Sequence, residues 1–174
     1  QRDGAYALVA LARAGKLETA RHLSKQFAEK DFFGGFGPEA DAPGLSLWAL
    51  GTVANQLRQE EFDQWLWPHV SRKAALIETM LQTSSNLYQK VEGPIVPKHK
   101  GNPNLSLVAE PARDGLIVGK MDHHRPVLFV NAISYRGLVE ASQLADRLRH
   151  VDDARHWALT ADKLKKAWEA KLAK

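Results

Sequence analysis

The sequence predicts an all-α fold made of stacked antiparallel helical hairpins. Two observations lead to this prediction: apolar residues recur at helical spacing along most of the 174 residues, and the helical stretches come in pairs separated by short breaks. The length is close to the usual size of one domain, and 44% hydrophobic residues are enough to fill a core. We therefore expect residues 1–174 to form a single domain or a fragment of a larger helical domain.

The first predicted hairpin covers about residues 3–29. Apolar residues such as Leu8 and Leu11 form one face of its first helix, and the pattern breaks at Gly15 and Lys16 before resuming at Leu17. A short break between two amphipathic stretches is typical of an antiparallel helix pair.

Two more hairpins are predicted at about residues 45–82 and 131–172. The second follows the punctuation of Pro43 and Gly44, and its helices are expected at about 45–59 and 62–82. The third contains helices at about 131–149 and 151–172. The segments LETARH (17–22) and VDDARH (151–156) resemble each other and open the second helix of the first and third pairs, which indicates an internal repeat whose hairpins must stack to bury their apolar faces.

Two segments break the helical pattern. Residues 31–44 mix Phe, Gly, Pro and carboxylates, and an insertion at about 84–130 contains five prolines and β-branched pieces. We expect the insertion to be partly β, with a hairpin around Leu105–Lys120. A connection of that length inside a compact domain is more often functional than idle.

Composition and missing motifs exclude several classes. The chain has no cysteine, which rules out disulfides, thiolate zinc sites and a cysteine nucleophile. No phosphate-binding glycine loop, nucleophile elbow or dinucleotide fingerprint is present. His123 and His124 are adjacent, so on an extended segment they point to opposite faces, and no metal or other cofactor is expected. The net charge of +4 is dispersed, and no apolar run is long enough to span a bilayer, so neither a nucleic acid nor a membrane is expected as a partner.

Three groups of charged residues are candidates for chemistry. Arg2 and Asp3 enter the first helix, where Asp3 could instead serve as a helix cap. Glu39 and Asp41 lie in the loop GPEADAPGL (37–45), where they could act on hydroxyl groups or interact with the dipole of the following helix. Glu92 follows the fourth helix, and by itself it resembles a surface residue before a turn.

Taken in order, four stretches resemble glucoamylase and its six-hairpin glycosidase relatives. The opening Arg-Asp is similar to the family element that holds the sugar at the cleavage subsite, and residues 37–45 are similar to the loop that lines the sugar pocket. Residues 67–70 (WPHV) resemble the Trp-Pro-x-Val start of the next long helix, and residues 129–140 (FVNAISYRGLVE) resemble a helix of the family. The resemblance implies about half of an (α/α)6 toroid, so the remaining half would come from the same chain or another subunit.

The activity implied by the resemblance is inverting hydrolysis of a glycosidic bond in an oligo- or polysaccharide. The family's catalytic acid corresponds to Gln89, which cannot donate a proton, so Glu92 or a carboxylate of the insertion must serve instead. We assign Glu92 as the catalytic residue. The residues assigned to substrate binding are Arg2, Asp3, Glu39, Asp41, Tyr88, His124 and Arg125.

Two other functions remain open. An inactive sugar-binding protein on the same fold would keep Arg2, Asp3 and Asp41 while lacking the acid, as Gln89 indicates. A helical-repeat interaction scaffold would explain the repeated ARH segments without any pocket. The sequence leaves the compartment undetermined, although a periplasmic or extracellular location is favoured.

Overall fold

The computed structural model is predominantly helical and carries one small sheet. It describes residues 2–32, 37–91, 101–102, 104–122, 124–125 and 127–172. Within these residues lie six helices, three predicted pairs in the expected order, so the prediction of a mostly helical fold is confirmed. Their bounds are α1 (Arg2–Arg13), α2 (Leu17–Glu29), α3 (Ala42–Leu57), α4 (Glu60–Gln82), α5 (Val127–Arg147) and α6 (Val151–Leu172).

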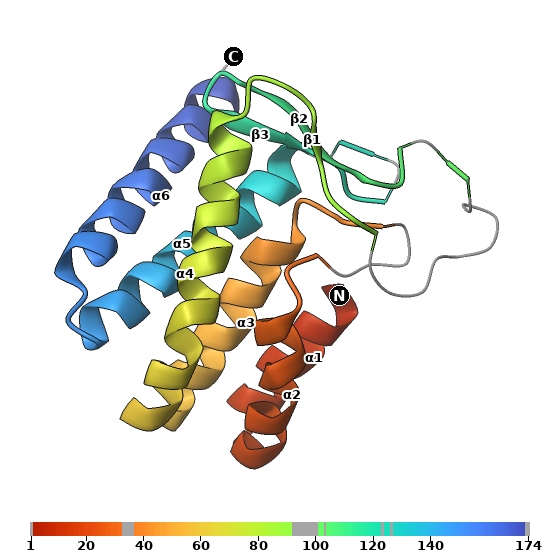
Figure 1. Cartoon of the computed structure of the whole chain (residues 1–174). Helices are drawn as coiled ribbons and strands as arrows, with labels where there is room; N and C mark the ends of the chain where they lie inside the picture. Colours follow the sequence, from red (N-terminus) through yellow and green to blue (C-terminus); the bar gives the residue numbers. More distant parts are fainter. Residues whose placement is uncertain are drawn as a thin grey trace.

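The helices pack in two layers. α3 lies between α1 and α5, while α2 packs against α1 and α3, α4 packs against α3 and α5, and α6 packs against α5. Figure 1 shows that α1, α3 and α5 begin at the end of the molecule that carries the sheet, where α2, α4 and α6 finish. The turns within each hairpin are short and lie at the opposite end. Both long connections therefore meet at one end of the helices.

The central position of α3 follows from its composition. The helix is apolar on all sides, as expected for a helix surrounded by others, and residues 42–47 are all buried. Two glycines let α3 approach α5 closely: a Cβ at Gly44 would lie 2.7 Å from the carbonyl oxygen of Ile133, and a Cβ at Gly137 would lie 3.0 Å from the Cα of Gly44. Larger residues at this crossing would push the two helices apart.

Two helices begin earlier than the sequence predicted. α3 begins at Ala42, three residues before the expected start, so Pro43 and Gly44 lie inside it, and α5 begins at Val127, four residues earlier than expected. The helix start that the resemblance put at residues 67–70 is wrong: α4 begins at Glu60, close to the start at about 62 that the spacing predicted, and Pro68 lies inside it. The exposed Pro68 removes one helical hydrogen bond, yet α4 continues to Gln82, since its buried side packs from Phe62 to Met80.

The sheet forms within the insertion. Its strands, β1 (Leu87–Tyr88), β2 (Leu107–Arg113) and β3 (Leu116–Gly119), pair antiparallel in the order β1-β2-β3. Strands β2 and β3 confirm the hairpin expected around Leu105–Lys120. Asn131 of α5 fixes the sheet to the helices, because its side chain accepts a hydrogen bond from the backbone N–H of Ile117 and donates one to the Ile117 carbonyl.

A buried charged group ties the end of α2 to α4. The ammonium of Lys73 is fully buried and donates to Asp31 Oδ1 at 2.9 Å, and Arg72 Nε donates to both carboxylate oxygens of Asp31 at 3.0 and 2.8 Å. We call Asp31, Arg72 and Lys73 the Asp31 cluster.

None of the helices in the described part of the chain combines the length and apolarity that a membrane crossing requires.

Candidate functional site

Charged side chains from three separate segments meet where α1, α3 and α5 begin. Arg2 lies in the first turn of α1, Glu39 and Asp41 precede α3, and Asp122 follows β3. Arg2 Nε donates to Asp41 Oδ2 at 3.0 Å, and its Nη2 lies 3.3 Å from Glu39 Oε2 and 3.2 Å from Asp122 Oδ2. We call these four residues the Arg2 cluster.

The loop that carries Glu39 and Asp41 is fixed to the exit of β3. The backbone N–H of Ala40 donates to the carbonyl of Lys120 at 2.8 Å. This approach requires Gly119, where a Cβ would lie 2.2 Å from the Cβ of Ala40. Gly37 has a φ of +85°, which favours glycine, and a Cβ there would lie 2.2 Å from the Leu105 carbonyl oxygen. Two glycines thus hold the carboxylate loop against the β insertion.

A tight turn presents Asp122 to the other members of the cluster. The backbones of Met121 and His124 exchange two hydrogen bonds of 3.0 Å, and Asp122 between them has a φ of 55°. Asp is one of the few residues besides glycine that tolerates this left-handed conformation. The backbone N–H of Asp122 also donates to Glu39 Oε1 at 3.3 Å. The turn therefore contacts Glu39 through its backbone and Arg2 through the Asp122 side chain.

One cation faces three carboxyl groups in this cluster, and the pKa values of two of them, Glu39 and Asp41, are raised. Burial, together with the nearby Asp41 and Asp122, raises the pKa of Glu39 to about 7, although Arg2 opposes the shift. Burial also raises the pKa of Asp41 against the opposing hydrogen bond from Arg2. Glu39 therefore retains its proton up to nearly neutral pH, as a general acid must.

A buried lysine borders the Arg2 cluster. Lys120 donates to the carbonyls of Leu105 and Asn104 at 2.9 and 3.2 Å. Burial lowers the pKa of Lys120 to about 8, an effect that the charge of Glu39 opposes and that of Arg125 reinforces. Lys120 thus holds the residues before β2 beside the carboxylate loop.

The structure brings together three of the residues proposed from sequence, namely Arg2, Glu39 and Asp41. Asp3 is exposed in the first turn of α1, inside the helix rather than at its cap, and makes no hydrogen bond or ion pair within the described residues. Arg125 lies near Lys120 and forms an ion pair with Glu110 at 3.1 Å.

Two of the other proposed residues, Tyr88 and His124, are not members of the Arg2 cluster, and Glu92 lies outside the described residues. The exposed Tyr88 belongs to β1, where its hydroxyl accepts a hydrogen bond from Asn86. His124 is exposed and contributes its backbone to the Asp122 turn. Glu92, the proposed catalytic residue, and His123 lie outside the described residues.

Sequence reasoning missed Asp122 and Lys120. An aspartate near a turn is common, and nothing in the local pattern separates Asp122 from the other acidic residues of the insertion. The only available signal was the general expectation that a carboxylate of the insertion serves the site. The link to Arg2 spans 120 residues and depends on how β3 packs against the loop before α3.

Comparisons with known proteins identify no relative of this chain. No protein-family model, curated protein or solved structure matches it.

Proposed function

We propose that the chain is a glycoside hydrolase that cleaves oligo- or polysaccharides by acid/base catalysis with inversion, on a scaffold that forms about half of an (α/α)6 toroid. One observation above all supports the proposal: the Arg2 cluster gathers three carboxyl groups around one guanidinium, and Glu39 among them has a pKa of about 7. Glycosidic hydrolysis needs a carboxylic acid that remains protonated at working pH beside groups that bind hydroxyls.

The arrangement of the helices supports a partial toroid. The odd-numbered helices form one layer and the even-numbered helices cover it, so a further hairpin added beside α5 and α6 would continue both layers. A groove of about 280 Å³ runs along the outer side of this pair, lined partly by Tyr135, Val139 and Ala161. At the opposite edge, Tyr6 of α1 is 49% exposed. We propose that the remaining half, from the same chain or another subunit, covers these edges.

Each member of the cluster has a role in the proposed reaction. Protonated Glu39 donates its proton to the leaving oxygen, in place of the acid that the resemblance puts at Gln89. Asp122, whose side chain is 34% exposed, accepts hydrogen bonds from sugar hydroxyls. Arg2 Nη1 makes no hydrogen bond within the described residues, so it can donate to the same sugar. The water-activating base belongs to the missing half.

A sugar-binding protein without activity is the second candidate. The side chain of Glu39 is only 8% exposed, and both of its oxygens already accept hydrogen bonds, from Arg2 and from the backbone of Asp122. A carboxyl group held in this way can support a binding pocket without reaching a glycosidic oxygen.

The test is an activity assay on the longest natural chain that contains these residues. Gluco-, xylo- and arabino-oligosaccharides with α or β linkages are supplied, and NMR follows the anomer released. We expect inversion at the anomeric centre, and a loss of about 100-fold or more in Glu39→Gln, since a general acid contributes roughly 10²–10⁴-fold. Activity should also fall above pH 7, where Glu39 loses its proton.

Variants at three further positions, compared with Glu39→Gln, separate the alternatives. Glu78→Gln, a change on α4 beside His156, is the matched control and should keep full activity. Loss of activity in Glu92→Gln but not in Glu39→Gln would move the acid to Glu92. Sugar binding without turnover, weakened by Arg2→Met, would favour the inactive binding protein.

A further inference from the structure

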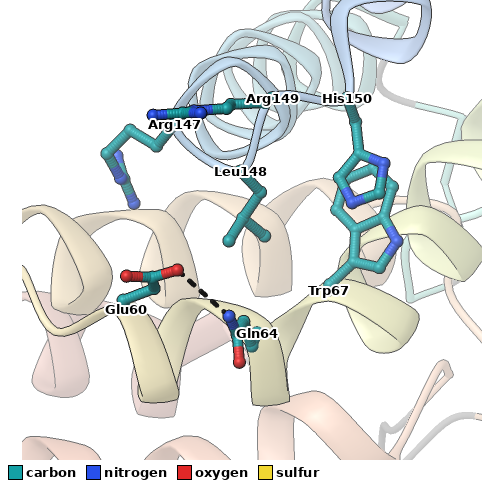
Figure 2. Close-up of a pocket in the computed structure, with 7 residues that line it drawn as sticks. All are labelled: Glu60, Gln64, Trp67, Arg147, Leu148, Arg149 and His150. Carbon is teal, nitrogen blue, oxygen red and sulfur yellow. Dashed lines mark hydrogen bonds between the residues drawn. The ribbon is translucent and has the colours of Figure 1, made fainter.

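A cavity lies at the end of the helices opposite the Arg2 cluster. It has a volume of about 570 Å³ and opens between the start of α4 and the turn that joins α5 to α6. Figure 2 shows three side chains of α4 facing Arg147, which ends α5, and the three residues of the turn that follows it. Small-molecule sites have volumes of roughly 300–1,000 Å³, so the cavity is large enough for a ligand. The lining residues are Glu60, Gln64, Trp67, Arg147, Leu148, Arg149 and His150.

Arg149 has a backbone conformation that favours glycine. Its φ is 64°, its N–H donates to the Asp146 carbonyl at 3.0 Å, and the N–H of His150 donates to the Ala145 carbonyl at 2.9 Å. This pattern is a Schellman motif, whose left-handed position is usually occupied by glycine. An arginine there costs about 1 kcal/mol relative to glycine.

The first hairpin contains the same turn with the expected residue. Gly15, with a φ of 75°, donates to the Ala12 carbonyl, and Lys16 donates to the Leu11 carbonyl. The two turns precede the similar segments 17–22 and 151–156, so they are equivalent positions of the repeat. Arg149 therefore departs from a glycine that suits the turn, and its guanidinium makes no hydrogen bond or ion pair within the described residues. Arg149 is exposed and lines the cavity, so its guanidinium is available to a partner outside the chain, and its strained backbone is a feature often found at functional sites.

Three other residues that line the cavity already have partners within the protein. Arg147 donates to both carboxylate oxygens of Asp63 and to Asn55, so its charge is met within the protein. The rings of His150 and Trp67 stack in parallel, with centroids 3.9 Å apart and planes 1° apart. Because His150 is exposed, its ring is accessible to a further planar group.

We propose that this cavity binds an anion that carries a planar ring, of the class of nucleoside phosphates. The ring stacks on the imidazole of His150, and the anionic group pairs with Arg149. Glu60 and Gln64, which are joined by a hydrogen bond of 3.2 Å, present one carboxylate and one amide to the polar edge of the ring or to hydroxyl groups. The acidic Glu60 selects the position of the anion, because it repels a phosphate from the α4 side and leaves Arg149 as its partner.

The experiment titrates the whole chain with AMP, adenosine and inorganic phosphate, followed by the NMR signals of the Trp67 indole and the His150 imidazole. We expect AMP to shift both signals and to bind more tightly than adenosine or phosphate by about tenfold or more, since ring and anion each contribute. Arg149→Gly should weaken AMP binding by about tenfold while preserving the fold, because glycine suits the turn.

Arg58→Gly is the matched control. Arg58 also has a left-handed conformation, with a φ of 49° at the end of α3, and does not line the cavity. This variant loses the same charge and relieves similar strain, so it should bind AMP as the unaltered protein does. Equal weakening in both variants, binding of phosphate as tight as that of AMP, or no shift of the two ring signals would each overturn the proposal.

Discussion

The Arg2 cluster and the Asp31 cluster are both partly buried groups of charges, but their balance is opposite. In the Asp31 cluster two cations surround one carboxylate. Burial would raise the pKa of Asp31, yet the hydrogen bonds and charges of Arg72 and Lys73 outweigh it and hold this pKa below its usual value. In the Arg2 cluster one cation serves three carboxyl groups, and burial together with the nearby Asp41 and Asp122 raises the pKa of Glu39 to about 7.

This contrast shows how the ratio of charges separates a structural tie from a reactive group. An anion with surplus cations stays ionised and holds two segments together, as Asp31 does for the end of α2 and α4. A carboxyl group with too few cations keeps a proton that it can transfer near neutral pH. Burial adds to the difference, because the side chain of Glu39 is 8% exposed and that of Asp31 is 29% exposed.

Removing the carboxylate of Asp31 should lower the stability of the protein more than any other change proposed here. Asp31→Asn leaves the fully buried Lys73 and the neighbouring Arg72 without a carboxylate. We expect the free energy of unfolding at pH 7 to fall by about 3–5 kcal/mol, because an unpaired buried charge is strongly unfavourable. The free energy of unfolding is measured by urea denaturation, with circular dichroism as the signal.

The double variant Asp31→Asn/Lys73→Met is the control for this effect. An apolar side chain at position 73 needs no anion, so part of the lost stability should return. A loss below about 1 kcal/mol in Asp31→Asn alone would show that the cluster is not a structural tie.

The second prediction concerns the pH dependence of stability in Glu39→Gln. Since the pKa of Glu39 rises from 4.5 to about 7 on folding, the folded protein binds more protons than the unfolded chain between these values. The contribution of Glu39 to stability is therefore fully present below pH 4.5 and is lost as the pH rises to 7. The amide that replaces the carboxyl group does not titrate, so the variant should gain about 2–3 kcal/mol relative to the unaltered protein as the pH rises through this window.

Thermal or urea unfolding across this pH range provides the measurement. Asp31 should show the opposite sign, because its pKa is lowered on folding: its contribution is present above pH 3.8 and is lost as the pH falls. Parallel stability curves for Glu39→Gln and the unaltered protein would contradict the raised pKa.

The ion pair of Arg125 and Glu110 should contribute least to stability. Both side chains are 30% exposed, so water screens their attraction. Arg125→Ala should change the free energy of unfolding by less than about 1 kcal/mol, and NaCl at about 1 M should remove most of the difference. A larger loss that persists in salt would mean that Arg125 belongs with the buried clusters rather than with the surface.

The local pattern was sufficient to predict the helices and the β-hairpin. Helical spacing and the break at Gly15 indicated the hairpins, since these signals lie within a few turns of the helices they predict. The similar segments 17–22 and 151–156 indicated that the hairpins repeat. The pattern was less reliable at boundaries, since α3 and α5 begin three and four residues before their predicted starts. Pro68 lies inside α4, as the helical spacing predicted, because buried contacts on either side outweigh one lost hydrogen bond.

For the candidate site, the local sequence was enough to place Arg2, Glu39 and Asp41 as charged groups next to helix starts. Tertiary packing was needed to bring Asp122 to them, and to raise the pKa of Glu39 while lowering that of Asp31. Acidity depends on burial and on the charges within a few ångströms. Those neighbours come from segments far apart in the chain, so they are set when β3 packs against the loop before α3.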